Sequence, residues 1–94
     1  MSAAQGGADG RFEVRTADGA VLKAFSEGSG QPLLLVSGLG GTAGFWADNA
    51  ATLARSFRVI RFDQRGIGAS TRGSAPCTIA QLAMDCAAVL DAAG

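Results

Sequence analysis

The sequence has no histidine among its 94 residues, and this absence excludes several kinds of site. A Ser-His-Asp triad, a Cys-His dyad and a histidine-ligated metal site all need an imidazole, so none can form within this chain. An excess of one charge is also missing, because 8 Lys and Arg balance 8 Asp and Glu. Zero net charge argues against a broad surface for nucleic acid or an anionic membrane. We therefore expect neither as a partner.

Long hydrophobic runs are missing too. The longest aliphatic run, Leu33 to Val36, is far shorter than the roughly 20 residues that span a bilayer. Residues 1–10 lack the basic and apolar regions of a secretory signal. The two cysteines, Cys77 and Cys86, lie nine positions apart, which fits neither a metal site nor a disulfide framework. The sequence thus predicts free thiols and a cytoplasmic location.

The residues that are present describe a small globular unit rich in glycine. Hydrophobic residues make up 48% of the chain, and 14 of the 94 residues are glycine, about twice the average usage. The length suits one small domain or a piece of a larger one. The patterning predicts a flexible leader over 1–10, strands near 11–16, 20–26, 33–37 and 57–62, and helices near 45–55 and 78–93.

The order of these elements indicates the fold class. Phe12, Val14 and Thr16 alternate with charged residues, as on a half-buried strand. Asp18-Gly19 suits the tight turn of a hairpin, so the first two strands are expected to be antiparallel. The strand, helix, strand, helix order that follows predicts parallel strands with right-handed crossovers, an α/β fold.

Each predicted helix carries its own pattern. Trp46, Ala50 and Leu53 recur at helical period in the first, and Phe57, at the start of the next predicted strand, continues the same spacing. The second begins with a Thr78-x-x-Gln81 sequence, which has the form of a capping box. Its apolar face is predicted to comprise Ile79, Leu82, Ala83, Cys86, Val89, Leu90 and Ala93.

A glycine-rich turn follows the apolar strand, and its spacing allows a first interpretation. Residues 38–43 read G-x-G-x-x-A, and Asp63 closes the next predicted strand 23 positions after Gly40. A dinucleotide-binding unit has this spacing, with pyrophosphate at the helix N-terminus and the carboxylate on the ribose. An antiparallel hairpin before the fingerprint strand, however, is unusual for such a unit.

A second interpretation uses the longer string around Asp63. Residues 63–70 read D-x-R-G-x-G-x-S, and SGLGG over 37–41 precedes them by a helix and a strand. Together these segments resemble the N-terminal part of α/β-hydrolase-fold proteins, in the enol-lactonase and aminoacrylate-hydrolase-like branch. The resemblance covers about residues 12–94. It implies a partial α/β-hydrolase domain over 11–94, with the G-x-S-x-G nucleophile elbow expected beyond Gly94.

The resemblance also implies roles for single residues. The backbone N–H of Leu39 would line an oxyanion hole, and Gly38, Gly40 and Gly41 would form the turn around it. Phe45 and Trp46 would pack in the core or form a pocket wall, or else contact the substrate directly. Ser37 is not an elbow nucleophile, because Leu35 and Leu39 occupy the positions that require glycine. The set expected to brace the loop after the fourth strand is Asp63, Arg65, Gly66, Gly68 and Ser70.

The implied activity is hydrolysis of an ester, lactone, carbamate or amide-like carbonyl in a small-molecule substrate, with no metal or organic cofactor. The chain alone is predicted to be inactive, since it lacks the nucleophile, the acid and the histidine. Leu33 to Val36 is expected to form an exposed edge through which the isolated chain self-associates. A non-catalytic module completed by a partner chain through this strand stays an alternative.

Overall fold

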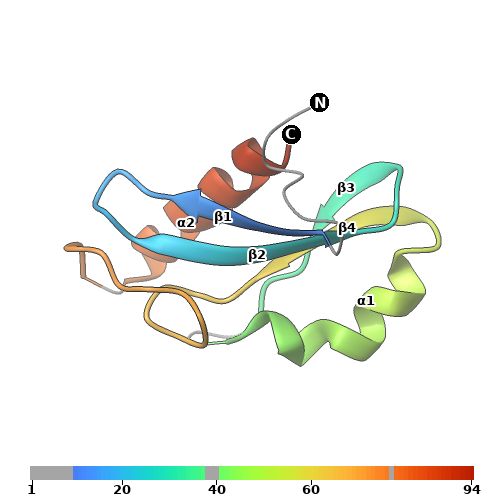
Figure 1. Ribbon diagram of the computed structural model, residues 1–94, viewed down its shortest axis with the longest axis horizontal. Coiled ribbons are helices and arrows are strands. Elements are labelled where there is room, and N and C mark those ends of the chain that lie inside the picture. Colours follow the sequence, from blue (N-terminus) through green and yellow to red (C-terminus); the bar gives the residue numbers. More distant parts are fainter. Residues whose placement is uncertain (1–9, 38–40, 77) are drawn as a thin grey trace.

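The computed structural model describes residues 10–37, 41–76 and 78–94 of the chain. Its elements, in chain order, are β1 (Arg11–Arg15), β2 (Val21–Glu27), β3 (Gln31–Leu34), the 3₁₀ helix η2 (Ala43–Trp46), α1 (Ala47–Leu53), β4 (Phe57–Phe62) and α2 (Ile79–Ala93). The strands form one sheet in the order β1-β2-β4-β3 (Figure 1). β2 pairs antiparallel with both β1 and β4, whereas β3 and β4 are parallel. The predicted hairpin and parallel crossover are confirmed.

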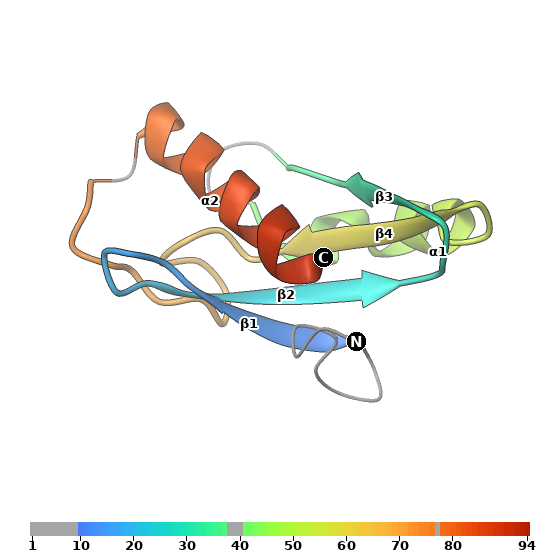
Figure 2. The same cartoon turned by 90° about the horizontal axis from the view of Figure 1, so that it is seen from above.

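The two α-helices cover opposite faces of this sheet. Figure 2 shows α2 lying across one face, with α1 behind β4 on the other. Alternate residues of β1 and β2 are buried on the α2 side, as the period of two predicts. The core there comprises Phe12, Val14, Ala20, Leu22, Ala24, Ile60, Phe62, Val89 and Ala93. Burying a side chain such as Val89 contributes about 1.5–3 kcal/mol to stability.

The strand predicted near 33–37 lies earlier in the chain. β3 pairs with β4 from Gln31, opposite Phe57, to Leu34, opposite Ile60. The Leu35 N–H makes one more bond to the Ile60 carbonyl, at 2.9 Å, and the ladder then ends. Register with β4 sets these bounds, whereas the prediction followed the apolar run. β3 is the last strand at this edge of the described sheet, and Val36 beside it is 40% exposed.

The first predicted helix, 45–55, is shorter and begins differently. A 3₁₀ turn over Ala43–Trp46 leads into α1, which ends at Leu53. Phe57, which continues the spacing of the helical stripe, is the first residue of β4, and the strand predicted near 57–62 has these bounds in the structure. Periodicity does not fix the ends of a helix, because apolar residues beyond them can continue the same stripe, as Phe57 does.

The apolar face predicted for α2 is partly wrong. Ile79 is 68% exposed and Leu90 is 40% exposed. Ala83 also faces outward. The face toward the sheet consists of Leu82, Asp85, Cys86, Ala88, Val89, Ala92 and Ala93. Contact with β1, β2 and β4 selects this narrower stripe.

The capping box at the start of α2 is half formed. The Thr78 side chain accepts a hydrogen bond from the Gln81 N–H at 3.0 Å. The Gln81 amide does not return this bond, and its Nε2 donates to Asp85 at 3.0 Å instead. No helix in the parts of the chain that the structure describes is long and apolar enough to cross a membrane.

Candidate active site

The candidate site lies where the chain leaves β3 and β4, because the carboxyl ends of these parallel strands meet at one edge of the sheet. The glycine turn leaves β3, and the D-x-R-G-x-G-x-S loop leaves β4. Ser37 and Gly41 are the described residues that bound the turn. Gly38, Leu39 and Gly40, which carry the predicted oxyanion hole, lie outside the described residues. The structure therefore describes the whole loop over 63–70, and it describes the turn at Ser37 and Gly41.

Asp63 joins the two loops. Its carboxylate is buried, with Oδ1 accepting from the Ala43 N–H at 2.8 Å and Oδ2 from the Ala69 N–H at 3.0 Å. Ala43 is the first residue of η2, so Asp63 fixes the point where the glycine turn becomes helix. Because both carboxylate oxygens bond to the backbone, they are poorly placed to bind a ribose. This geometry speaks against the dinucleotide interpretation.

Arg61, two residues before Asp63, holds the same point from the α1 face. Its Nη1 donates to the Ala43 carbonyl at 2.9 Å, and its Nη2 lies 3.4 Å from Glu27. The guanidinium carbon lies 5.3 Å from the centre of the Phe25 ring, a cation–π distance. Both backbone polar groups of Ala43 are thus bonded to side chains from β4 or directly after it.

Gln64, which the sequence interpretation left without a role, contacts both ends of the glycine turn. Its backbone N–H donates to the Gly41 carbonyl at 3.2 Å. Its side-chain Nε2 donates to the Ser37 carbonyl, also at 3.2 Å. The residue is only 4% exposed.

The rest of the loop folds back onto β2. Ser70 donates to the Asp63 carbonyl at 2.6 Å and accepts from the Lys23 N–H at 2.8 Å. Gly66 and Gly68 have φ of 73° and 57°, in the left-handed region that favours glycine. A Cβ at Gly68 would lie 2.5 Å from Asp63 Oδ2, so this glycine is needed for close approach as well as for its φ.

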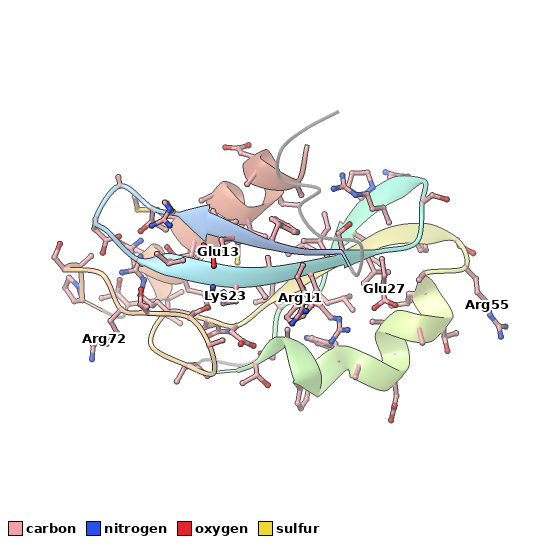
Figure 3. All side chains as sticks on the ribbon, viewed as in Figure 1. Arg11, Glu13, Lys23, Glu27, Arg55 and Arg72 are labelled. Carbon is pink, nitrogen blue, oxygen red and sulfur yellow. The ribbon has the colours of Figure 1, made fainter. Side chains whose placement is uncertain are left out.

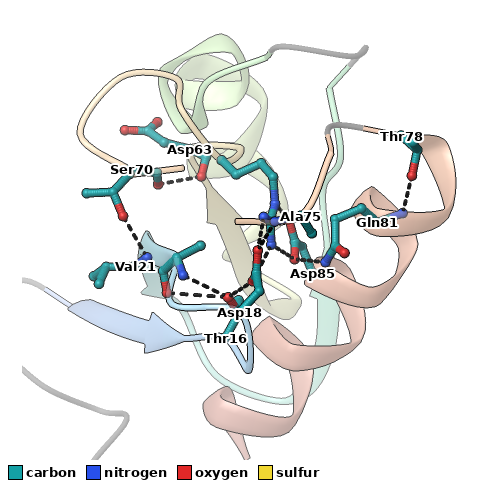
Figure 4. A network of polar contacts seen from close by, with 12 residues as sticks. Thr16, Asp18, Val21, Asp63, Ser70, Ala75, Thr78, Gln81 and Asp85 are labelled. Carbon is teal, nitrogen blue, oxygen red and sulfur yellow. Dashed lines mark hydrogen bonds and ion pairs between the residues drawn. The ribbon is translucent and has the colours of Figure 1, made fainter. Parts of the chain in front are cut away.

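Arg65 lies at the centre of a buried polar network, between the carboxylates of Asp18 and Asp85, which are labelled in Figure 4. Nε and Nη2 donate to the two oxygens of Asp85, at 2.8 and 2.9 Å. Nη1 and Nη2 also donate to Asp18, at 2.7 and 3.1 Å. The bonds to Asp85, with those to Asp18, raise the pKa of Arg65 above its ordinary value. The pKa of the Asp18 carboxyl is held well below its usual range. The main cause is the hydrogen bonds from Arg65, and those from Thr16 and the Ala75 N–H lower it further.

Sequence reasoning missed both partners of Arg65. Asp18 was interpreted only as a turn residue, although Thr16 and Ala75 also donate to its carboxylate, at 2.5 and 2.9 Å. Asp85 lies in the middle of the apolar stripe of α2 and is 1% exposed. A carboxylate at such a position requires a buried cation. That signal could have identified Asp85 as a partner of Arg65.

The aromatic pair at the start of the first helix is not part of the core. Phe45 is 69% exposed and meets Trp46 edge to face, with ring centres 5.2 Å apart. Trp46 is half-buried, and its Nε1 is buried without a hydrogen-bond partner among the described residues. Phe45 does not pack in the core of the described structure, and a place in a pocket wall or in contact with the substrate stays a prediction for both residues.

A separate open cavity of about 380 Å³ lies over the β1–β2 hairpin. Its lining comprises Arg11, Phe12, Glu13, Lys23, Ala24, Phe25 and Ala69. Figure 3 shows Arg11, Glu13 and Lys23 on the α1 side of the sheet. Glu13 pairs with Lys23, and this pairing lowers the pKa of the Glu13 carboxyl. The cavity thus lies on the strands that precede the candidate site.

The comparisons with known proteins agree with this geometry. A family model described as "alpha/beta hydrolase fold" matches residues 31–94, more than half of the chain. The chain therefore belongs to the alpha/beta-hydrolase-fold family, and the predicted resemblance is confirmed. The RutD protein of Azorhizobium caulinodans, a proposed carbamate hydrolase, is 48% identical over 67 residues, which are 71% of this chain and 25% of that protein.

Solved structures give the same family. An alpha/beta hydrolase from Sphaerobacter thermophilus has a TM-score of 0.79 at 38% identity, covering 87% of this chain and 32% of its own. The enol-lactonase from Burkholderia xenovorans has a TM-score of 0.71 at 32% identity, covering 79% and 30%. This chain spans about a quarter of the RutD protein's length and about a third of each of these two structures.

Proposed function

We propose that this chain supplies the first strands and the oxyanion turn of a hydrolase that acts on an ester, lactone, carbamate or amide-like carbonyl. The observation that carries the proposal is the attachment of the glycine turn to the loop after β4. Asp63, Gln64 and Arg61 bond to Ser37, Gly41 and Ala43, which lie on both sides of Leu39. The proposed carbamate hydrolase and the enol-lactonase among the similar proteins support a carbonyl substrate.

In the proposed mechanism, a nucleophile attacks the carbon of the substrate carbonyl. The carbonyl oxygen then gains negative charge. The N–H of Leu39 donates to that oxygen from a position fixed before the reaction, so little reorganisation is needed. Phe45, exposed at the start of the helix that follows the turn, is suited to a wall of the substrate pocket. The serine-hydrolase type of nucleophile is part of this proposal.

The nucleophile, its acid and its histidine would come from other parts of the complete protein. This sequence has no histidine and no serine with glycines at the elbow spacing. We therefore propose that the 94-residue chain is inactive by itself. A cytoplasmic location, based on the two thiols predicted to be free, belongs to the same proposal.

The test compares the complete protein that carries this segment with the isolated chain. The complete protein is expected to turn over an activated aryl ester and to react covalently with an alkyl phosphonate probe. The isolated chain is expected to do neither. Turnover by the isolated chain, or probe attached within its 94 residues, would contradict the proposal, as would a complete protein inert to both reagents.

A further inference from the structure

Gln64 occupies a position that the loop motif leaves open. The D-x-R-G-x-G-x-S pattern specifies Asp63 and Arg65 but not the residue between them. That residue is nevertheless 4% exposed and bonded to the ends of another loop. We propose that Gln64 is a positioning residue that holds the oxyanion turn in its working conformation. This inference rests on the proposed function.

The two bonds of Gln64 act on opposite ends of the turn. The side-chain bond reaches Ser37, the described residue before the turn, and the backbone bond reaches Gly41, the described residue after it. One residue in the loop after β4 therefore restrains the distance between two points that are four positions apart in the sequence. Asp63 and Arg61 bond to Ala43, so the exit from the turn is also held by them, whereas the Gln64 side chain holds its entrance.

The turn needs support of this kind because of its composition. Three of the five residues from Ser37 to Gly41 are glycine, which has the widest choice of backbone conformations. An oxyanion donor works because it is fixed before charge develops. A displacement of about 1 Å can cost about 100-fold in rate. Restraint must then come from outside the turn, and the Gln64 amide provides it at the entrance.

The chemistry of the contact favours glutamine. The Ser37 carbonyl requires a donor, and the site is too buried for an unpaired charge to be tolerated. A glutamine amide donates while remaining neutral, whereas a methionine cannot donate and an ionised glutamate can only accept. Gln64→Met and Gln64→Glu keep nearly the same side-chain length and remove the bond to the Ser37 carbonyl, leaving the backbone bond to Gly41 in place.

Gln81 offers a matched control. It is also a glutamine, and its amide donates a hydrogen bond to Asp85, but it lies on α2 and not beside the turn. Gln64→Met, Gln64→Glu and Gln81→Met would be made in the complete protein. The measurements are kcat and KM for an activated ester, the thermal midpoint, and hydrogen exchange of the backbone amides over 38–41.

We expect both Gln64 variants to lower kcat about tenfold or more while KM stays within about twofold, since the donor acts on the transition state. Exchange over 38–41 is expected to speed up in these variants only. In Gln64→Met the thermal midpoint should fall no further than in Gln81→Met, whereas Gln64→Glu, which buries an unpaired charge, should lower it more. A merely structural role would lower the midpoint without changing kcat in the folded protein.

The outcomes separate the inference from the proposed function. Unchanged exchange over 38–41, or a kcat for both Gln64 variants within about twofold of Gln81→Met, would overturn the inference while leaving the proposed function intact. The complete protein could hydrolyse no ester while its Gln64 variants still exchange faster over 38–41. That result would support the restraint of the turn by Gln64 and contradict the proposed function.

Discussion

Arg65 and Asp85 form a buried two-point ion pair that joins the loop after β4 to α2. The Nε–Oδ2 and Nη2–Oδ1 distances are 2.8 and 2.9 Å, and the side chains are 5% and 1% exposed. The same guanidinium bonds to Asp18 in the β1–β2 turn. The guanidinium of Arg65 therefore joins the β1–β2 turn, the loop after β4 and α2. It lies in the same loop as Asp63 and Gln64, which bond to the glycine turn.

We expect Arg65→Met to lower the free energy of unfolding of the complete protein by about 3–5 kcal/mol, because it leaves the Asp85 carboxylate buried without its cation. Urea unfolding monitored by circular dichroism measures this loss. The double variant Arg65→Met with Asp85→Leu is expected to recover part of it, since the buried charge is gone. A loss below about 1 kcal/mol for the single variant would show that the ion pair is dispensable.

Asp18 should make stability depend on acid pH. Its folded-state pKa is lowered, chiefly by the hydrogen bonds from Arg65, so the folded state binds its proton less readily than the unfolded state does. The stability from this group is complete above the unfolded pKa of about 4 and is lost as pH falls toward the folded-state value. We expect Asp18→Asn to flatten the decline of unfolding free energy below about pH 4. If the unfolding free energy of Asp18→Asn falls below about pH 4 as steeply as that of the parent protein, this prediction is refuted.

Gly68 and Gly19 provide a matched pair of left-handed glycines. A Cβ at Gly68 would meet Asp63 Oδ2 at 2.5 Å, whereas at Gly19, with φ of 93°, it would meet nothing within 4 Å. Gly19→Ala should lower the free energy of unfolding by about 1–2 kcal/mol through backbone strain alone. Gly68→Ala should cost clearly more, since Asp63 must also move. Equal losses in chemical denaturation would mean that the Asp63 contact does not restrict Gly68.

Local sequence patterns predicted most of the fold, because the alternation of apolar and polar residues depends on which face of each element is buried. The alternation around Phe12 and Val14 predicted a half-buried strand, and β1 has that burial. The order of elements predicted the crossover that β3 and β4 make. The end of β3 at Leu34 was not predictable in this way, because it depends on register with Ile60 in another part of the sequence.

The candidate site was predictable in part. The motif identified Asp63 and Arg65, but their partners come from tertiary contacts. Asp18 is 47 positions from Arg65, and Ser37 is 27 positions from Gln64. No local spacing links such residues. Of these partners, only Asp85 could have been recognised in the sequence, because it is a charged residue within the apolar stripe of α2.

The edge strand β3 should make the isolated chain self-associate. β3 has β4 as its single neighbour in the described sheet, and Val36 beside it is 40% exposed. Unpaired backbone groups and exposed apolar side chains favour pairing between copies. We expect size-exclusion chromatography with light scattering to show oligomers, and Val36→Lys to shift them toward monomer. A monomeric parent chain that melts cooperatively would contradict this prediction.

The central claim, that the turn after β3 carries an oxyanion donor, is tested most directly at the Leu39 backbone. Leu39→Pro removes the N–H, and Leu39→Ala removes only the side chain. In the complete protein, kcat for an activated ester is expected to fall about 100- to 1,000-fold in Leu39→Pro and to stay near the parent value in Leu39→Ala. A Leu39→Pro protein that folds and keeps the kcat of Leu39→Ala would contradict the account.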